Sequence, residues 1–557
     1  MVQKNQKLVV EIVDLSSEGA GVAKVDGYPI FVKDTLVGEK VEILVLRANK
    51  NYGFGKAINI IEASPDRVEP KCPVASKCGG CSIQHMSYDC QLKYKKNKVY
   101  QNLKRIGGFD DIEVEDTIGM DEPFYYRNKA QYPVGYDKGI ITGFYAANSH
   151  RIIDFDNCYI GSKRNKEILN KVKNFIVENN ITAYDETTGR GIVRHILIRE
   201  GHFTGEIMVC LIVNGSKFKY KTQLAEALKD VEGVKSVSVN YNTTKSNVIL
   251  GDKVETVYGS DFITDYIGDL KFEISPLSFF QVNPVQTQKL YGKALEYADL
   301  NGEEIVVDAY CGIGTISLFL AQKAKMVYGV EIVPQAIEDA KKNAKNNKID
   351  NAEFYVGKSE EIVPELYKTK GVKPDVMVVD PPRKGCEESL LNLMLQMQPK
   401  RIVYVSCDSA TLARDLKILC ATNEYEIKKV QPVDMFPHTG HVETVVLLSH
   451  KKPDGHINVK VEFGEGEGKV PLDDIAQRAE SYKPKERVTY KMIKEYIEVK
   501  YGFKVHTAYI AEVKRDLGLP MYDAPNAVEE LKQPRKHPTP EKVEAIKDAL
   551  KYFGVCS

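Results

Sequence analysis

Tryptophan is absent from the 557 residues, and neither sign of charge is in excess, since Lys plus Arg and Asp plus Glu each number 77. Overall charge therefore indicates no class of partner, and any basic surface for nucleic acid must be local. No apolar run is long enough to span a bilayer, and Met-Val-Gln-Lys-Asn does not open a signal peptide. We expect a cytoplasmic monomer with no membrane partner.

Cysteine, in contrast, is present 11 times, and 31 Tyr and 19 Phe supply the aromatic surfaces that tryptophan does not. In a reducing compartment, that many cysteines indicate metal binding or catalysis more than disulfides. The length predicts several domains, because single cores rarely grow beyond about 250–300 residues.

Residues 1–65 read as short β-branched and aromatic strands with Gly at the breaks, which predicts a small barrel of the oligonucleotide-binding type. On composition alone, a structural cap and an RNA-binding module fit this barrel equally well. Residues 66–280 predict a central α+β domain, with clear strands in GIVRHILIRE and SVSVNYN.

A helix is predicted after the first cysteines, because Leu92, Val99, Leu103 and Ile106 recur at helical spacing before Gly107-Gly108. From Lys93 to Arg105 this stretch holds six Lys or Arg and no acid. A solvated helix face and a phosphate contact are both open.

Residues 281–452 alternate strands, Gly-rich turns and helices, which predicts a doubly wound α/β domain that binds a ligand at the carboxyl ends of its strands. The sheet is expected to end near Ser449. Residues 453–557 predict a linker and a small helical module. Its helices are expected from Thr489 to Tyr501, from Thr507 to Leu517, and from an N-cap at Thr539 onward. An RNA-contact module and a plain helical appendage are both open.

The turn DAYCGIGT is the candidate cofactor loop. Asp308 closes a strand, and Gly312 and Gly314 let the backbone approach a ligand at the next helix. A dinucleotide fingerprint needs a third Gly, but residue 317 is Ser, and Glu331 ends the following strand where it can accept hydrogen bonds from ribose hydroxyls. The pattern favours S-adenosylmethionine over NAD.

Three more residues carry candidate chemistry. Asp380 closes an apolar strand in front of Pro381-Pro382, which fix the backbone so that the carboxylate faces the cleft. Cys407 lies between an apolar run and a predicted helix, whose N-terminus is expected to lower the thiol pKa. It can equally be a small packed residue. Glu443 is a lone acid at the start of an apolar strand, where burial would raise its pKa toward that of a general base.

Taken in order, DAYCGIGT, DPPRKG, VSCDSATLARDL and HVETVVLL resemble the RNA 5-methyluridine methyltransferases, most of all the 23S rRNA (uracil-5-)-methyltransferase type. FFQVNP (279–284) and YRNKAQYP (126–133) are also similar to segments of that family, and the first barrel resembles its TRAM domain. The resemblance extends from residue 1 to about residue 450. It implies a Rossmann-like class I methyltransferase domain and an RNA-binding barrel.

The resemblance also implies a mechanism. A thiolate adds to C6 of uracil so that C5 becomes nucleophilic enough to take the methyl group, and a base then removes the C5 proton. It assigns these roles to Cys407 and Glu443 and places four residues in the S-adenosylmethionine pocket: Gln281, Tyr310, Glu331 and Asp380. Of these four, Gln281 and Asp380 can also contact the target uracil.

KCPVASKCGGC places Cys72, Cys78 and Cys81 together, and three thiols need a fourth metal ligand. Cys90 is a candidate by proximity. The resemblance instead selects Cys158 and implies a [4Fe–4S] cluster, which we interpret as structural or as part of the RNA-binding surface.

Three rival readings remain. A 5-methylcytosine RNA methyltransferase would carry cysteine where Arg383 follows the two prolines, and an amine N-methyltransferase would leave Cys407 and Glu443 without a role. A non-catalytic iron–sulfur assembly factor is the third.

Cys311 and Cys386 lie beside motifs, and we expect both to be packing residues. Related enzymes modify 23S rRNA or tRNA; the barrel and the cysteine cluster favour 23S rRNA here, and the target uridine is not readable.

Overall fold

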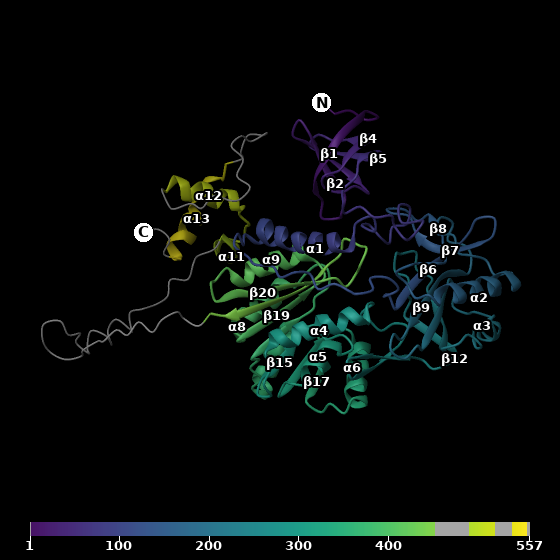
Figure 1. The fold of residues 1–557 in the computed structure, drawn as a ribbon. Coiled ribbons are helices and arrows are strands. Elements are labelled where there is room, and N and C mark those ends of the chain that lie inside the picture. The colour runs from purple at the N-terminus through teal and green to yellow at the C-terminus, as the bar shows by residue number, and fades with distance from the viewer. Residues whose placement is uncertain (1, 452–489, 518–536, 554–557) are drawn as a thin grey trace. The chain divides into compact units, whose positions relative to one another are not determined.

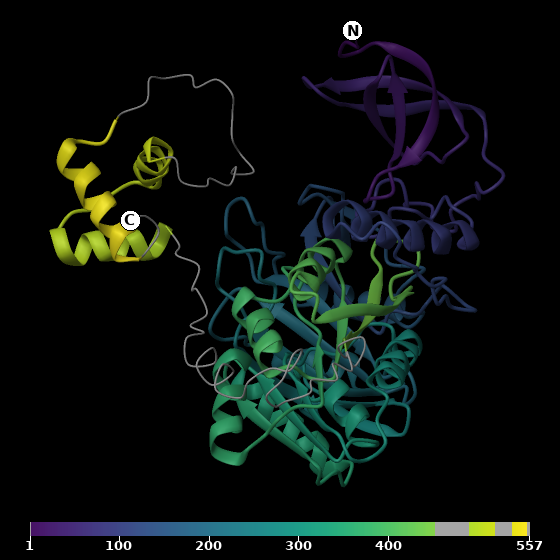
Figure 2. The same cartoon turned by 90° about the vertical axis from the view of Figure 1, so that its left-hand side faces the viewer.

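The computed structural model describes residues 2–451, 490–517 and 537–553. Residues 1–454 and 455–557 form two separate compact units, each described by itself below. Figures 1 and 2 show the elements of both units from two directions. In the described part of the chain, no helix is both long and apolar enough to cross a membrane.

The first five strands form a closed barrel in the order β1-β2-β3-β5-β4, as the sequence predicts. Alternate residues point inward, and Ile12, Ile30 and Ile43 are fully buried while Val9 and Val13 are exposed. The strands are β1 (Lys7–Leu15), β2 (Gly21–Val25), β3 (Tyr28–Lys33), β4 (Lys40–Ala48) and β5 (Gly53–Glu62).

A seven-stranded sheet follows in the order β12-β11-β10-β9-β6-β7-β8. Its core packs against α2 (Asn165–Glu178) and α3 (Lys221–Leu228). The two strands that the sequence marked are β9 and β11. The strands are β6 (Lys129–Tyr136), β7 (Ile140–Tyr145), β8 (Ile152–Asp154), β9 (Val193–Glu200), β10 (Ile207–Val213), β11 (Val234–Tyr241) and β12 (Lys253–Gly259), and a hairpin of β13 (Ile263–Ile267) and β14 (Leu270–Ile274) comes next.

The second seven-stranded sheet has the order β17-β16-β15-β18-β19-β21-β20, with five parallel strands and an antiparallel pair, β21 and β20, at one edge. Its strands are β15 (Ile305–Asp308), β16 (Met326–Glu331), β17 (Ala352–Val356), β18 (Val376–Val379), β19 (Arg401–Ser406), β20 (Tyr425–Val433) and β21 (Glu443–His450). Its helices are α4 (Pro284–Ala298), α5 (Thr315–Ala321), α6 (Pro334–Asn346), α7 (Ser359–Lys370), α8 (Glu388–Met397) and α9 (Ser409–Cys420).

Neighbouring residues of the central strands pack into different cores. Val306 and Val378 belong to one hydrophobic core with α4, α5 and α6, whereas Val307 and Met377 belong to a second core with α8 and α9. This is the doubly wound arrangement that the sequence predicts. The chain reverses its direction of winding between β15 and β18, which is where such sheets bind ligands.

The helix predicted after the first cysteines is α1 (Tyr88–Asn102), continued by the π-helical turn η1 (Leu103–Gly107). Gly108, at a φ of +78°, ends it. Val99 and Leu103 are fully buried, but Ile106 is 40% exposed, so the buried stripe stops short of the last predicted position.

The basic residues of this stretch divide into two groups. Lys93, Lys104 and Arg105 are exposed, as a solvated face requires, whereas Lys95 and Lys98 fit neither open interpretation. Lys95 is fully buried and Lys98 is half-buried. Their ammonium groups bond to Asp434 and to the carbonyls of Phe436 and Gly440. These two side chains are therefore neither exposed to bulk solvent nor available to a phosphate, because groups within the protein already bond to them.

The C-terminal unit contains α11 (Tyr490–Tyr501), α12 (Thr507–Asp516) and α13 (Pro540–Tyr552), close to the three predicted helices. Ile497, Ile510 and Ile546 form the centre of its core. Thr539 is the N-cap of α13 and Pro540 begins the helix, as predicted, although the Thr539 side chain makes no capping hydrogen bond. Residues 452–489, which include the expected linker and Thr489, lie outside the described residues.

Candidate active site

A cavity of about 1090 Å³ lies at the carboxyl ends of the central strands of the second sheet, at the switch in winding direction. We call it the strand-end cavity. It brings together all six residues that the sequence placed in a catalytic or cofactor role, two of them on strands β16 and β21 and four in loops. Its lining includes Gln281, Tyr310, Glu331, Asp380, Cys407 and Glu443.

The loop between β15 and α5 shapes one end of this cavity. Gly312 and Gly314 have φ of +54° and +84°, a left-handed conformation that favours glycine. Glu331 Oε2 accepts a hydrogen bond of 3.3 Å from the backbone N–H of Gly312. Ser317, at the position where a dinucleotide fingerprint has glycine, donates from Oγ to Asp308 Oδ2 at 2.6 Å. The serine thus fixes the carboxyl group that closes β15.

Three carboxyl groups with raised pKa values lie in or beside the cavity. Burial raises the pKa of Asp308 to about 6 and that of Asp380 to about 7, and in each case a second acid adds to the rise. Burial, with the charge of Asp380, also raises the pKa of Glu443 well above its ordinary value, while Arg383 opposes the rise. The direction predicted for Glu443 is therefore confirmed.

Cys407 follows β19 and precedes α9, as predicted, but its thiol is not activated in this state of the protein. Burial raises its pKa to about 12, and the charges of Glu443 and Asp380 add to the rise. The helix does not lower it as expected, because Asp408 caps α9 and its Oδ1 accepts the N–H groups of Ala410 and Thr411, at 2.9 and 3.1 Å.

Three lining residues were not assigned a role from the sequence. Arg383 acts on both Cys407 and Glu443, lowering the pKa of each. Phe436 and His441, from the segment before β21, also line the cavity. Burial and then Arg383 lower the pKa of His441 to about 4, so it is neutral at pH 7. Their positions in the sequence could have indicated Arg383 and His441 as site residues, because Arg383 follows the two prolines and His441 lies two residues before Glu443.

A second cavity, of about 330 Å³, is lined by Cys72, Cys78, Cys81 and Cys158. We call it the cysteine cavity. Cys90 instead packs with residues of α1 and the barrel, so it is Cys158 that joins the triplet. Burial raises the pKa of all four thiols, and the charge of Cys158 adds to the rise at each of the other three.

The cysteine cavity also contains an unpaired donor. Gln84 lines it, and Gln84 Oε1 accepts from the backbone N–H of Cys72 at 2.8 Å. Its amide nitrogen is buried with no hydrogen-bond partner among the described residues. Within the same part of the chain, no three His, Cys, Asp or Glu side chains are close enough to hold one metal ion.

The remaining cysteines beside motifs are packing residues, as predicted. Cys311 and Cys386 are 3% and 5% exposed and belong to the two cores of the second sheet. The cysteines of the described residues form no disulfide.

Two family models match the chain. Residues 200–451 match the tRNA (uracil-5-)-methyltransferase model, and residues 2–58 match the TRAM domain. An RNA methyltransferase of Halalkalibacterium halodurans is 54% identical over 452 residues, which are 81% of this chain and 98% of that protein. An RNA methyltransferase of Clostridium tetani is 52% identical over 451 residues, 81% of this chain and 97% of its own.

A solved structure is also similar. The tRNA (uracil-54, C5)-methyltransferase of Pyrococcus abyssi, in complex with S-adenosyl-L-homocysteine, has a TM-score of 0.64 and 32% sequence identity. The match covers 79% of this chain and all of that one.

Proposed function

Because the chain belongs to the RNA uracil-5-methyltransferase family, we propose that it methylates C5 of a uracil in RNA, with Cys407 as nucleophile and Glu443 as base. The observation that carries this proposal is that one cavity contains a thiol, a buried glutamate and the residues expected to hold the methyl donor. An N-methyltransferase would leave the thiol and the glutamate without a role. A 5-methylcytosine enzyme would need cysteine at Arg383.

The proposed reaction uses both groups in turn. The Cys407 thiolate forms a bond to C6 of uracil, and the electron pair of the C5–C6 double bond moves toward O4, giving an enolate. S-adenosylmethionine supplies the methyl group as an activated sulfonium substituent; C5 of the enolate bonds to it as the S–CH3 bond breaks, which leaves neutral S-adenosylhomocysteine. The Glu443 carboxylate then removes the C5 proton. The C5–C6 double bond re-forms as the C6–S bond breaks, which releases the thiolate.

Electrostatics explain how a thiol of high pKa can react here. The cavity is lined by Glu331, Asp380 and Glu443, and Asp308 is buried directly before its lining residue Ala309, so these acids favour a positively charged ligand. A sulfonium ion bound among these acids favours the ionised forms of both the carboxyls and the thiol. Arg383 acts on Cys407 in the same direction. We therefore propose that the nucleophile and the base become ionised only when the donor is bound.

The proposed binding roles follow from side-chain chemistry. Glu331 accepts from the ribose hydroxyls of the donor, with Gly312 fixing its carboxylate. Tyr310 belongs to the same loop and lines the cavity. The buried amide of Gln281 and the carboxyl of Asp380 hold the donor and read the O4 and N3–H edge of the uracil.

We propose that Cys72, Cys78, Cys81 and Cys158 hold a [4Fe–4S] cluster in the cysteine cavity. Each cysteine binds a different iron in such a cluster, so the thiols need not converge on one ion. The unpaired amide nitrogen of Gln84 fits this group as well, because cluster sulfurs accept hydrogen bonds and because an orphaned buried donor is costly. The cluster would be structural or part of the RNA-binding surface. No step of the reaction uses it.

The RNA class is a further proposal. We propose that the substrate is 23S rRNA and that the TRAM barrel binds part of it. The presence of the barrel and of the cysteine cluster favours this substrate. The Pyrococcus abyssi relative is named as a tRNA enzyme, which supports tRNA as the second candidate. A cytoplasmic enzyme acting as a monomer fits either substrate.

A covalent trap tests the function. The protein and S-adenosylmethionine are incubated with 5-fluorouridine-substituted 23S rRNA fragments and with substituted tRNA, and cross-linked peptides are identified by mass spectrometry. Fluorine cannot be removed as a proton, so an adduct on Cys407 is expected, and the RNA that carries it names the substrate. Bound cofactor with no adduct on any RNA would overturn the proposal in favour of an N-methyltransferase or an assembly factor.

A further inference from the structure

One face of α1 is polar where a core-facing helix would be apolar. Gln91, Lys95, Lys98 and Asn102 are spaced by four, three and four residues, so they form one stripe along the helix. We call them the α1 stripe. Each of the four side chains bonds to a segment that leads directly to Cys407 or to Glu443.

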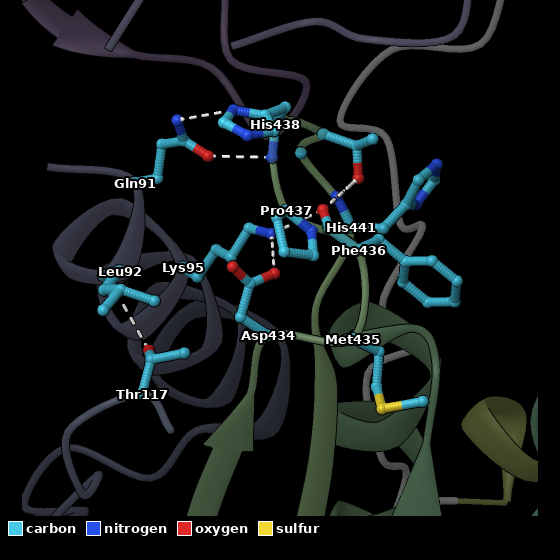
Figure 3. A network of polar contacts seen from close by, with 12 residues as sticks. Gln91, Leu92, Lys95, Thr117, Asp434, Met435, Phe436, Pro437, His438 and His441 are labelled. Atoms are coloured by element: carbon cyan, nitrogen blue, oxygen red, sulfur yellow. Dashed lines mark hydrogen bonds and ion pairs between the residues drawn. The ribbon is translucent and has the colours of Figure 1, made fainter. Parts of the chain in front are cut away.

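Three members of the stripe hold the segment 434–442, which joins β20 to β21. Figure 3 shows Lys95 and Asp434 pointing toward each other in an ion pair, and both side chains are fully buried. Lys95 Nζ also donates to the carbonyl of Phe436 at 2.9 Å. Near the other end of the segment, Lys98 Nζ donates to the carbonyl of Gly440 at 2.7 Å.

Gln91 holds the middle of the same segment. Gln91 Oε1 accepts from the backbone N–H of His438 at 2.8 Å, and Gln91 Nε2 lies 3.2 Å from His438 Nδ1 (Figure 3). His438 has a φ of +67°, which is unusual for a residue with a side chain. The backbone N–H groups of Ser82 and Ile83 both donate to its carbonyl, at 3.0 and 3.2 Å.

The segment has little structure of its own. Its internal backbone hydrogen bonds among the described residues are short-range, such as Thr439 N to the carbonyl of Phe436 at 3.2 Å. Yet it carries Phe436 and His441, which line the strand-end cavity, and it ends immediately before Glu443. Its conformation therefore depends on groups outside it, and the α1 stripe supplies many of them.

The fourth member of the stripe contacts the other catalytic element. Asn102 Nδ2 donates to Ser409 Oγ at 2.8 Å, and Ser409 is the first residue of α9, two residues after Cys407. Ser409 is buried, and α1 packs against α9. One rigid helix thus contacts the supports of both reacting side chains.

We propose that the α1 stripe sets the placement of Cys407 relative to Glu443. Gln91, Lys95 and Lys98 act as positioning residues for proton abstraction, and Asn102 acts as one for thiol addition. This inference rests on the proposed roles of Cys407 and Glu443 and adds residues more than 300 positions away from them in the sequence.

The two steps can be measured separately. Adduct formation with 5-fluorouridine-substituted 23S rRNA fragments and tRNA reports thiol addition and methyl transfer. The fraction of enzyme trapped on the unsubstituted RNAs during turnover reports proton abstraction. Lys98→Met and Gln91→Met are expected to raise the trapped fraction about tenfold, because small displacements at a reacting centre cost that much or more. Their rates of 5-fluorouridine adduct formation should stay within about twofold of wild type.

Matched variants separate positioning from folding. Asn102→Ala should instead slow adduct formation and lower, not raise, the trapped fraction. Lys98→Arg keeps a donor for the Gly440 carbonyl and should behave as wild type. Lys96→Met is the control on the same helix, since Lys96 pairs with exposed Asp116 and is not part of the stripe. A variant that is only less stable should lose active enzyme for both steps alike and should not change one step relative to the other.

Two results are decisive against the inference. If Lys98→Met and Gln91→Met slow both steps equally, or change neither, the stripe does not position the base. If wild-type protein forms no adduct with either RNA, the proposed function is overturned, and the positioning role falls with it.

Discussion

Cys407 and Glu443 lie at the same end of two neighbouring antiparallel strands, where Cys407 follows β19 and Glu443 begins β21. Ser406 of β19 pairs with Thr444 of β21 at the end of the register; Cys407 directly follows Ser406, and Glu443 directly precedes Thr444. The side chains of Cys407 and Glu443 both line the strand-end cavity. The charge of the glutamate accordingly raises the pKa of the thiol.

Cys407→Ala should abolish both turnover and the 5-fluorouridine adduct, because no other described thiol of the strand-end cavity is placed as the nucleophile. Gel-shift of the RNA under denaturing conditions measures the adduct. Cys420→Ala is the control, since Cys420 lies at the far end of α9 and packs against the core. Methylation that survives Cys407→Ala would favour N-methyl transfer.

Glu443→Gln should lower kcat by about 10²–10⁴-fold, the usual contribution of a general base. Because addition and methyl transfer precede the step that needs the base, the variant should accumulate a methylated covalent adduct with ordinary uridine RNA. Mass spectrometry of the trapped peptide measures it. A variant that is slow but forms no adduct would remove Glu443 as the base.

Affinity for S-adenosylmethionine should rise with pH. Asp380 has a pKa raised to about 7, so its carboxyl is neutral below that pH and charged above it, and a sulfonium cation prefers the charged form. Calorimetric titration should give about a tenfold gain from pH 6 to pH 8 if one group controls binding.

The neutral ligand S-adenosylhomocysteine provides the control for that experiment, since it lacks the sulfonium charge and should show a flatter profile. Asp380→Asn should flatten the profile for the cation as well. Equal pH dependence for both ligands would show that charge complementarity with Asp380 does not control binding.

Cys158→Ser should lower the iron content and the visible absorbance of the anaerobically purified protein, because Cys158 shares the cysteine cavity with the triplet. Cys90→Ser should leave both unchanged, since Cys90 packs elsewhere. The opposite pattern would make Cys90 the fourth ligand. Full iron content in both variants would mean that neither cysteine is required.

Lys95→Met should lower the free energy of unfolding by about 3–5 kcal/mol, because it leaves the buried Asp434 carboxylate without its cation. The double variant Lys95→Met/Asp434→Asn should recover part of that loss, as expected when both charges of a buried pair are removed together. Denaturant titration of the full chain measures both. Equal stability of the single variant and wild type would show that Tyr88, which donates to Asp434 Oδ2 at 2.9 Å, compensates alone.

Much of the fold and of the site could be predicted from residues that act locally. Glycines marked the turn before α5, and the apolar strand in front of Asp380 marked the carboxyl end of a central strand. The thiol pKa of Cys407 was predicted in the wrong direction. Its local cause, a helix N-terminus, was cancelled by the Asp408 cap and outweighed by burial and by acids that are distant in the sequence.

The sequence by itself determined the elements, their order and the residue types available for chemistry, because hydrophobic periodicity, glycine turns and strand-end acids depend only on near neighbours. Tertiary structure alone decided what the lysines of α1 bind and how Cys407 lies beside Glu443, and it placed Cys158, which the family resemblance had selected, with Cys72, Cys78 and Cys81. Those outcomes depend on burial, strand register and long-range pairing. A lysine that reads as a solvated charge from its neighbours in sequence becomes a structural ion once folding places an aspartate beside it.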